Sequence, residues 1–207
     1  KKLGEEGTLA FVCDSTNVFT EGTSGSEGDL LESLTNLIST CKERVFVSCF
    51  ASNVARIQTI AAAAQANDRN VVLAGRALWR FSEIGRTHGC LQNTPEFISE
   101  DHAGFLPRNK SLIICTGSQG EPRAALSRIA NGAHPQLNLD RGDTIIFSSR
   151  KIPGNETSIA RLHNQLIRAG TKVITEEDYF VHVSGHPARE ELIRMYQHVR
   201  PTISIPV

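Results

Sequence analysis

Paired cysteines and long apolar runs are both missing from this sequence of 207 residues. Its five cysteines stand singly, with no C-x-x-C pair and no metal-ligand spacing, which predicts reduced core residues. No stretch approaches the roughly 20 apolar residues of a membrane span, and the opening KKLGEEGT lacks the apolar region of a signal peptide. We therefore expect a cytoplasmic protein without a membrane partner.

An excess of charge of either sign is missing as well. Lys plus Arg and Asp plus Glu each number 22, so the formal net charge is zero and no global basic field attracts nucleic acid. Any site for a polyanion must therefore be local. With 40% hydrophobic residues, the chain is long enough to build the core of one large domain or two small ones.

Short β-rich runs alternate with segments in which apolar residues recur at spacings of three and four. The predicted strands are residues 8–14, 44–50, 70–75, 110–117, 143–149, 171–175 and 202–207. Such alternation favours an α/β fold, with a mostly parallel sheet and helices on both faces. Residues 88–109 fit neither period, and we expect a short helix with connecting loops there.

The loops after parallel strands gather along one edge of an open sheet, where ligands usually bind. The loops expected at that edge are residues 13–17, 49–53, 74–76, 115–122 and 148–156, which are rich in Ser, Thr, Asn and Gly. No G-x-G-x-x-G follows the first predicted strand, so a Rossmann-type nucleotide site has little support.

Two of these loops suit phosphate. In residues 116–120, TGSQG, the glycines and the start of a helix leave backbone N–H groups free for an anion. Residues 148–151, SSRK, repeat the arrangement after the next strand and add two cations. An ordinary βα turn and a solvated pair of basic side chains explain the same residues without a ligand. The candidate phosphate-binding residues in these loops are Thr116, Gly117, Ser118, Ser148, Ser149, Arg150 and Lys151.

Residues 182–187, HVSGHP, carry two histidines four positions apart around a Ser-Gly turn. In such a loop His182 and His186 can donate to phosphate oxygens or transfer a proton near neutral pH, and Ser184 and the Gly185 amide are further donors. Zinc ligation by the pair is disfavoured, because Ser-Gly breaks the helix that an H-x-x-x-H pair needs and no third ligand is near. A capping or core role for the histidines remains an alternative.

Asp14 ends the first predicted strand. A carboxylate at this place can orient a histidine or accept a proton near a reacting phosphate. A strand-end Asp is also common in Asx-turns and helix caps, so both interpretations stay open.

Five segments taken together resemble the ribonuclease J family of β-CASP metallo-β-lactamase nucleases. They are LGEEGTLAFVCDSTN at 3–17, FASNVARIQ at 50–58, ICTGSQGEPRAALSRIA at 114–130, SSRKIPGNE at 148–156 and HVSGHPAREEL at 182–192. The last segment and CDSTN are typical of β-CASP nucleases in general, whereas TGSQGEP and PGNE are typical of the bacterial ribonuclease J branch. The resemblance spans nearly the whole chain.

This resemblance implies a Rossmann-like β-CASP domain at 21–176, flanked by an end segment of the metallo-β-lactamase core at 1–20 and a return segment at 177–207. It implies that Asp14 and His186 form a hydrogen-bonded catalytic pair. It further implies that His182, Ser184 and Gly185 contact RNA phosphates, including one near the 5′ end, beside the TGSQ and SSRK loops.

The resemblance also implies a zinc-dependent 5′-exonuclease and endonuclease of RNA processing and decay, in which two zinc ions activate a water. The H-x-H-x-D-H stretch of the family is absent here, and the chain stops just before the place of a metal-binding histidine. We therefore expect a segment of a longer protein that lacks most of the metal ligands, binds no zinc properly and cleaves no RNA alone. The whole protein is expected to be a homodimer or larger. A non-catalytic RNA- or protein-binding module is the alternative, and the neutral charge favours it modestly.

Overall fold

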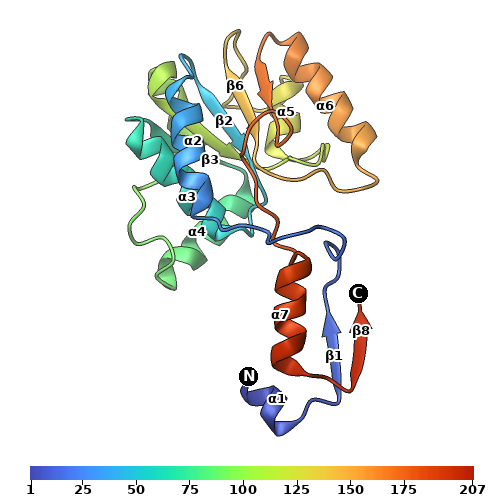
Figure 1. The fold of residues 1–207 in the computed structure, drawn as a ribbon. Helices are drawn as coiled ribbons and strands as arrows, with labels where there is room; N and C mark the ends of the chain where they lie inside the picture. The colour runs from blue at the N-terminus through green and yellow to red at the C-terminus, as the bar shows by residue number, and fades with distance from the viewer. The chain divides into compact units, whose positions relative to one another are not determined.

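The apolar runs of the sequence form parallel strands in two separate sheets. The computed structural model describes residues 1–207 and divides into two units, Glu27–His182 and the smaller unit Lys1–Ser26 with Val183–Val207. The expected α/β class with parallel strands and flanking helices is confirmed (Figure 1). The expected domain at 21–176 begins and ends a few residues before the larger unit, Glu27–His182. The assignment of the two flanking segments to a metallo-β-lactamase core stays a prediction.

The larger unit contains a six-stranded sheet in the order β4-β3-β5-β2-β6-β7. Its strands are β2 Val45–Ser48, β3 Asn70–Ala74, β4 Ile98–Ser99, β5 Ser111–Cys115, β6 Thr144–Phe147 and β7 Lys172–Ile174. Every residue of β2, β5 and β6 is buried, as expected for central parallel strands that helices cover on both faces. The loops after the strands of this sheet therefore share its carboxyl edge.

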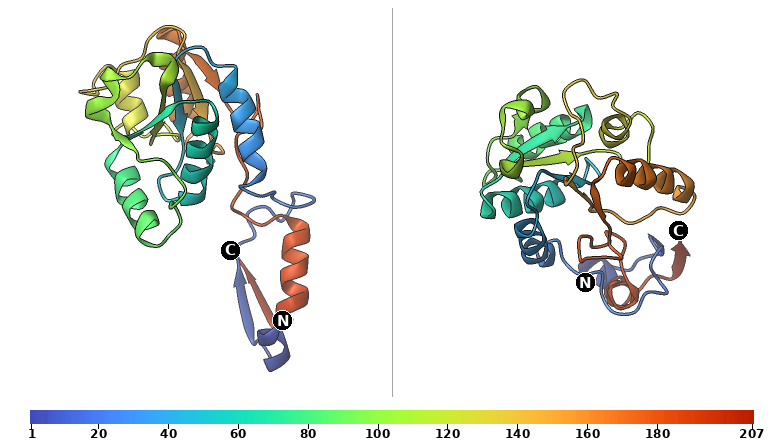
Figure 2. Two further views of the ribbon diagram at one scale, coloured as in Figure 1. Left: turned by 90° about the vertical axis from the view of Figure 1, so that its left-hand side faces the viewer. Right: turned by 90° about the horizontal axis from the view of Figure 1, so that it is seen from above.

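Five α-helices cover this sheet. They are α2 Asp29–Ser39, α3 Val54–Ala66, α4 Arg76–Thr87, α5 Ala125–Ala130 and α6 Glu156–Arg168. Helix α3 packs against α2 and α4, whereas α5 packs against α6, so the helices form two groups (Figures 1 and 2). Helix α3 begins after Asn53, whose side chain accepts a hydrogen bond from the backbone N–H of Arg56 at 2.9 Å.

Alternate residues of the central strands point to one face of the sheet and form an apolar core there. Phe46 of β2, Ile113 of β5 and Ile145 of β6 are fully buried in it. Leu126 of α5 and Leu162 of α6 complete the same cluster. This packing fixes β5 and β6 side by side with β2, and so fixes the places at which their loops begin.

Residues 88–109 differ from the expectation of one short helix. They contain the two-residue strand β4 and a 3₁₀-helix, Glu100–Phe105, and a second 3₁₀-helix follows at Arg108–Lys110. A strand of two residues is too short to show a period of two in the sequence. A 3₁₀-helix has three residues per turn, so it does not show the period of 3.6 that marks an α-helix.

In the smaller unit, β1 Ala10–Cys13 pairs in parallel with β8 Ile203–Pro206. Helices α1 Lys2–Glu6 and α7 Arg189–Val199 belong to the same unit, and the ring of Tyr196 meets Phe11 edge-on at 5.3 Å between centroids. Since β1 lies in this second sheet, the expectation that its loop shares the edge of the main sheet is wrong. Periodicity predicts a strand but not its partners.

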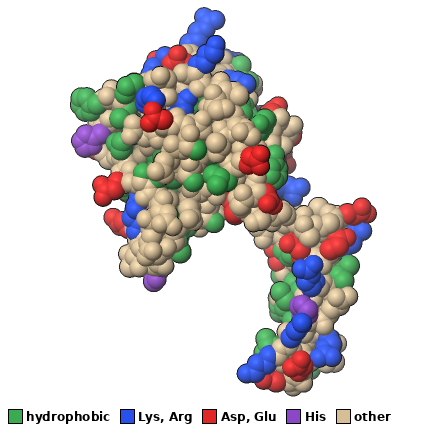
Figure 3. Space-filling model, turned by 60° about the vertical axis from the view of Figure 1, so that its left-hand side comes forward, with side chains coloured by type: hydrophobic (Ala, Val, Ile, Leu, Met, Phe, Trp, Pro, Cys, Tyr) green, Lys and Arg blue, Asp and Glu red, His purple; other side chains and the backbone are tan.

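Charged side chains of both signs are interspersed on the face drawn in Figure 3, without a broad basic patch. This distribution agrees with the equal numbers of basic and acidic residues in the sequence. None of the helices has the length and apolar character required to span a bilayer.

Candidate functional site

The smaller unit brings Asp14, just after β1, into contact with His186, which lies in the loop before α7. Nδ1 of His186 is 2.6 Å from Oδ2 of Asp14. Thr16 donates to the other carboxylate oxygen through its backbone N–H at 2.9 Å and its hydroxyl at 2.7 Å. Asp14 thus forms an Asx-turn and holds the histidine at the same time. Catalysis by the pair stays a prediction.

Hydrogen bonds determine the ionisation of Asp14. Those from Thr16, followed by the one from His186, lower the pKa of Asp14 from 3.8 to about 2. The carboxylate is therefore charged at neutral pH and can only accept, so Nδ1 of His186 carries a proton. Both side chains are roughly half exposed, at 41% for Asp14 and 52% for His186, so the pair is open to solvent.

The turn between the two motif histidines is held by its own unit. The Ser184 hydroxyl accepts from Asn17 Nδ2 at 2.9 Å and from the His186 backbone N–H at 3.1 Å. The His186 carbonyl accepts from Asn17 at 3.1 Å and from the Ser24 hydroxyl at 2.6 Å. These bonds use the oxygen of Ser184 as an acceptor and keep its hydroxyl proton for another partner. The roles predicted for Ser184 and Gly185 in phosphate binding remain predictions.

The two phosphate-suited loops of the larger unit are tied together by Gln119, which is 5% exposed. Its Nε2 donates to the Arg150 carbonyl at 2.9 Å, and its Oε1 accepts from the Ile152 N–H at 3.0 Å. The backbone N–H of Gln119 itself donates to Glu121 at 2.9 Å, so this N–H is already paired with a carboxylate. The two loops follow β5 and β6, which β2 separates in the sheet, and Gln119 joins them. The sequence did not indicate Gln119 as their link.

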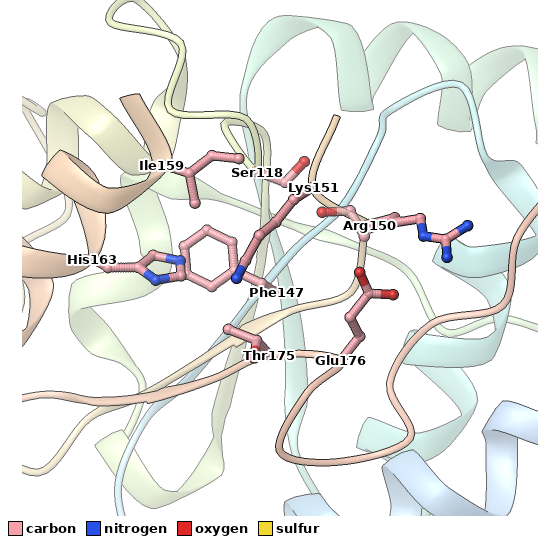
Figure 4. Close-up of a pocket in the computed structure, with 9 residues that line it drawn as sticks. Ser118, Phe147, Arg150, Lys151, Ile159, His163, Thr175 and Glu176 are labelled. Atoms are coloured by element: carbon pink, nitrogen blue, oxygen red, sulfur yellow. The ribbon is translucent and has the colours of Figure 1, made fainter. Parts of the chain in front are cut away.

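A small pocket lies at the carboxyl edge between these loops and the segment after β7 (Figure 4). Four of the predicted phosphate residues line it, namely Ser118, Ser149, Arg150 and Lys151. In Figure 4 the Lys151 side chain extends toward His163, whereas Arg150 extends away from it. Lys151 is paired with Glu177 at 2.6 Å, so its charge is partly compensated in the structure.

His163 forms one wall of this pocket and packs edge-on against Phe147, with 4.4 Å between ring centroids. Burial, followed by the nearby charge of Lys151, lowers the pKa of His163. Its Nε2 is buried without a hydrogen-bond partner. Thr116 and Gly117 precede Ser118 in the sequence and do not line the pocket. The Thr116 hydroxyl accepts from the Ala125 backbone N–H at 3.4 Å, and Gly117 has a φ of 117°.

His182, the last residue of the larger unit, sits against a buried arginine. Arg56 of α3 is 1% exposed, and its Nη1 lies 3.2 Å from Nδ1 of His182. The same nitrogen donates to the carbonyl and the hydroxyl of Ser148, each at 2.8 Å. Because the Ser148 hydroxyl in turn donates to the Val181 carbonyl at 2.7 Å, its proton is not free for a ligand. The backbone N–H of Ser148 also donates, to the Ser48 carbonyl at 2.9 Å, so both donors of Ser148 are already paired and its predicted role in phosphate binding is disfavoured.

Glu27 balances the charge of this arginine. Its two carboxylate oxygens accept from Arg56 Nε at 2.7 Å and Nη2 at 2.8 Å, and one accepts from Asn53 at 3.0 Å. Burial raises the pKa of Glu27, but the hydrogen bonds from Arg56 and Asn53 outweigh burial and lower it. Sequence reasoning missed Arg56. The available signal was a cation in a helix whose inward positions are otherwise apolar, such as Ile57 and Ile60.

No three His, Cys, Asp or Glu side chains gather in a group that could hold a metal ion. The five cysteines are free thiols. Burial raises the pKa of Cys49 to about 12 and raises that of Cys115 as well, which disfavours the thiolate form that metals bind. The residues of this chain therefore do not fit a zinc site by themselves.

Comparison with known proteins identifies the family of the chain. The family model for the β-CASP domain of ribonuclease J matches residues 42–166. Ribonuclease J of Sinorhizobium meliloti is 48% identical over 207 residues, which cover all of this chain and 37% of that protein. Ribonuclease J of Corynebacterium glutamicum is 42% identical over 208 residues, covering all of this chain and 29% of its own.

A third relative, Ribonuclease J2 of Bacillus subtilis, is 39% identical over 207 residues, covering all of this chain and 37% of that protein. This chain thus spans about a third of the length of the curated relatives it matches. Because the family model covers more than half of the residues, the resemblance noted in the sequence is confirmed. The chain belongs to the ribonuclease J family and carries its β-CASP domain.

Proposed function

We propose that this chain is the RNA-binding part of a metal-dependent ribonuclease. In the whole protein the activity is that of a 5′-exonuclease and endonuclease that cuts phosphodiester bonds during RNA processing and decay. The contact of 2.6 Å between Asp14 and His186 carries this proposal, because it fixes a histidine in the orientation that proton transfer needs. The similarity to proteins named Ribonuclease J supports the choice of RNA as the substrate.

The role proposed for His186 follows from its partner. Asp14 accepts the Nδ1 proton and remains charged, so it fixes the orientation of the ring and leaves Nε2 as the other ring nitrogen. From Nε2 a proton can pass to the oxygen that leaves the cleaved phosphodiester. His186 is therefore the proposed general acid, and Asp14 the residue that orients it.

The remaining site residues are proposed to hold the phosphate backbone. Ser184 keeps its hydroxyl proton available, and Gly185 beside it is an exposed residue whose backbone N–H is the proposed second donor. In the larger unit, Ser118, Ser149 and Lys151 border a common pocket. Phosphate contacts of this kind position a nucleic acid without reading its sequence.

Zinc belongs to this proposal only through the family resemblance. The described residues bring no three metal-ligating side chains together, so no step is assigned to a metal here. When bound in the whole protein, zinc would supply an activated water for attack on phosphorus. We propose RNA binding without cleavage by this chain alone, a cytoplasmic site of action, and assembly of the whole protein into dimers or larger oligomers.

The test is RNA binding by the chain across a salt series, with single-stranded RNA that ends in a 5′-monophosphate or a 5′-hydroxyl. We expect binding that weakens as salt rises and is tighter for the phosphorylated end. Loss of salt dependence, or no binding at low salt, would contradict the proposed grip on phosphates. Cleavage by the chain with added zinc or manganese, in preparations free of trace nucleases, would contradict the proposed lack of activity.

A non-catalytic module that holds RNA or a protein is the second candidate, and the zero net charge favours it. The sequence of the parent reading frame separates the two. An H-x-H-x-D-H stretch upstream of Lys1 and a histidine after Val207 would favour the enzyme, whereas their loss would favour the module.

A further inference from the structure

Arg56 and His182 form a contact that the proposed function does not require, and the Nη1 atom that makes it also donates to the carbonyl and the hydroxyl of Ser148. Nη1 of Arg56 lies 3.2 Å from Nδ1 of His182, while Nε and Nη2 are bound by Glu27. The guanidinium is 1% exposed and the histidine ring is half-buried. A buried charge in a network of this kind has a fixed position, because the loss of any of its hydrogen bonds would raise the free energy of the folded state.

The chemistry of the pair determines where the proton of the histidine sits. A guanidinium has donors only and is always protonated in proteins. A ring nitrogen that hydrogen-bonds to it can only accept, so the contact at 3.2 Å favours an unprotonated Nδ1. A neutral imidazole with an unprotonated Nδ1 carries its proton on Nε2.

The charges around the ring keep it neutral. Burial is the largest effect and Arg56 the second, and together they lower the pKa of His182 from 6.5 to about 4. Arg150 lowers the pKa further, whereas Glu27 opposes both arginines. Of the two histidines in the motif, His186 is thus held by a carboxylate at Nδ1 and His182 by a cation at Nδ1.

We propose that Arg56 is a positioning residue that holds His182 as a neutral imidazole protonated on Nε2, so that the ring presents a fixed N–H donor to a phosphate oxygen of the RNA. The phosphate part rests on the proposed function, whereas the protonation state does not. His182 then binds but does not transfer protons, and the two histidines of one motif have different tasks. Ser148 belongs to the same hydrogen-bond network, because its hydroxyl accepts from Arg56 and donates to the carbonyl of Val181, the residue before His182.

The first test observes the ring without RNA. ¹⁵N NMR of the side-chain nitrogens separates protonated from unprotonated ring nitrogens, and we expect His182 to show an Nε2–H tautomer that does not titrate between about pH 5 and 8. Arg56→Gln should raise the pKa of His182 toward its ordinary value, and Glu27→Gln should lower it. Opposite shifts from two neighbouring substitutions would not arise from general loosening of the fold.

Arg69 supplies the matched control. It is also a buried arginine of the larger unit, 7% exposed, but it donates to the backbone carbonyls of Cys41, Glu43 and Ser111 and not to a histidine. Arg69→Gln should cost stability and leave the His182 titration unchanged. If Arg56→Gln fails to fold, the wild-type tautomer and the Glu27→Gln shift still decide the inference. An Nδ1–H tautomer, or titration of wild-type His182 near pH 6.5, would overturn it.

The second test measures affinity for single-stranded RNA with a 5′-monophosphate. The side-chain amide of glutamine places an N–H donor near the position of Nε2 without the ability to gain a charge. We therefore expect His182→Gln to bind within a few-fold of wild type, and His182→Ala to lose roughly tenfold or more, the usual effect of one hydrogen bond to a charged acceptor. Equal losses in the two variants would overturn the donor role. Absence of RNA binding by the wild type would instead refute the proposed function and leave the tautomer result to decide the role of Arg56.

Discussion

Nδ1 of His186 and Oδ2 of Asp14 are 2.6 Å apart, although 172 positions separate the two residues in the sequence. Asp14 follows β1 and His186 precedes α7, and the parallel pairing of β1 with β8 brings these two ends of the chain into one unit. The second oxygen of Asp14 is occupied by Thr16. One carboxylate oxygen is thus used for the turn and the other for the histidine.

Asp14→Asn tests this division in a whole ribonuclease J that carries the segment. An amide at this place can present its NH₂ to Nδ1, which favours the wrong tautomer of His186. We expect kcat to fall by roughly 10²- to 10⁴-fold while the Kd for RNA changes little. Thr16→Val removes a bond to the other oxygen and should have a much smaller effect on kcat. Comparable losses in both variants would indicate that the turn, not the histidine contact, is what matters.

Lys151 and Glu177 give a prediction about RNA affinity. Their side chains form an exposed ion pair at 2.6 Å, so part of the lysine charge is compensated within the chain. Lys151→Ala should weaken RNA binding and reduce the slope of log K against log salt by roughly 0.7, the value for one phosphate contact on a single strand. Glu177→Gln should strengthen binding at low salt, because it frees the lysine. If Glu177→Gln has no effect in a Lys151→Ala background, the two residues act together.

Most of the fold could be predicted from the sequence because its strands are short apolar runs bounded by polar turns. The fully buried β2, β5 and β6 are the clearest of these, since central parallel strands have no polar face. The two-residue β4 was missed because it has no measurable period. The separation of β1 from the main sheet was also missed, because strand pairing depends on distant residues that a local pattern does not contain.

The candidate site was predictable to a different extent. Motif resemblance placed Asp14 with His186, and the structure shows that contact. Nothing local predicts that the Arg56 side chain reaches Ser148, 92 positions away in the sequence. Gln119 likewise looked like one more polar residue of a turn, and only the neighbouring loop gives its amide two backbone partners.

Gly120 and Gly132 form a matched pair for testing the TGSQG loop. Both have positive φ, 74° and 66°. A Cβ on Gly120 would lie 2.6 Å from the backbone of Ser158, whereas one on Gly132 would meet nothing within 4 Å. Gly132→Ala should cost about 1–2 kcal/mol for the left-handed backbone alone. Gly120→Ala should cost about 1–3 kcal/mol more, because α6 must move. Urea unfolding measures both, and equal losses would show that the loop does not press on α6 in solution.

His182 gives a prediction about stability and pH. Its pKa is about 4 in the folded chain, below the ordinary 6.5, so the unfolded chain takes up the proton more readily between these values. The contribution of the neutral ring to stability is therefore complete above about pH 6.5 and is lost as the pH falls toward about 4. In His182→Gln this component is absent, so the free energy of unfolding of wild type relative to the variant should decrease by roughly 1–3 kcal/mol as the pH falls through that window.

His134 and His163 also have lowered pKa values, but they are present in both proteins and cancel in the difference. Urea unfolding at several pH values checks this, and a difference that stays constant with pH would mean that His182 is not held neutral.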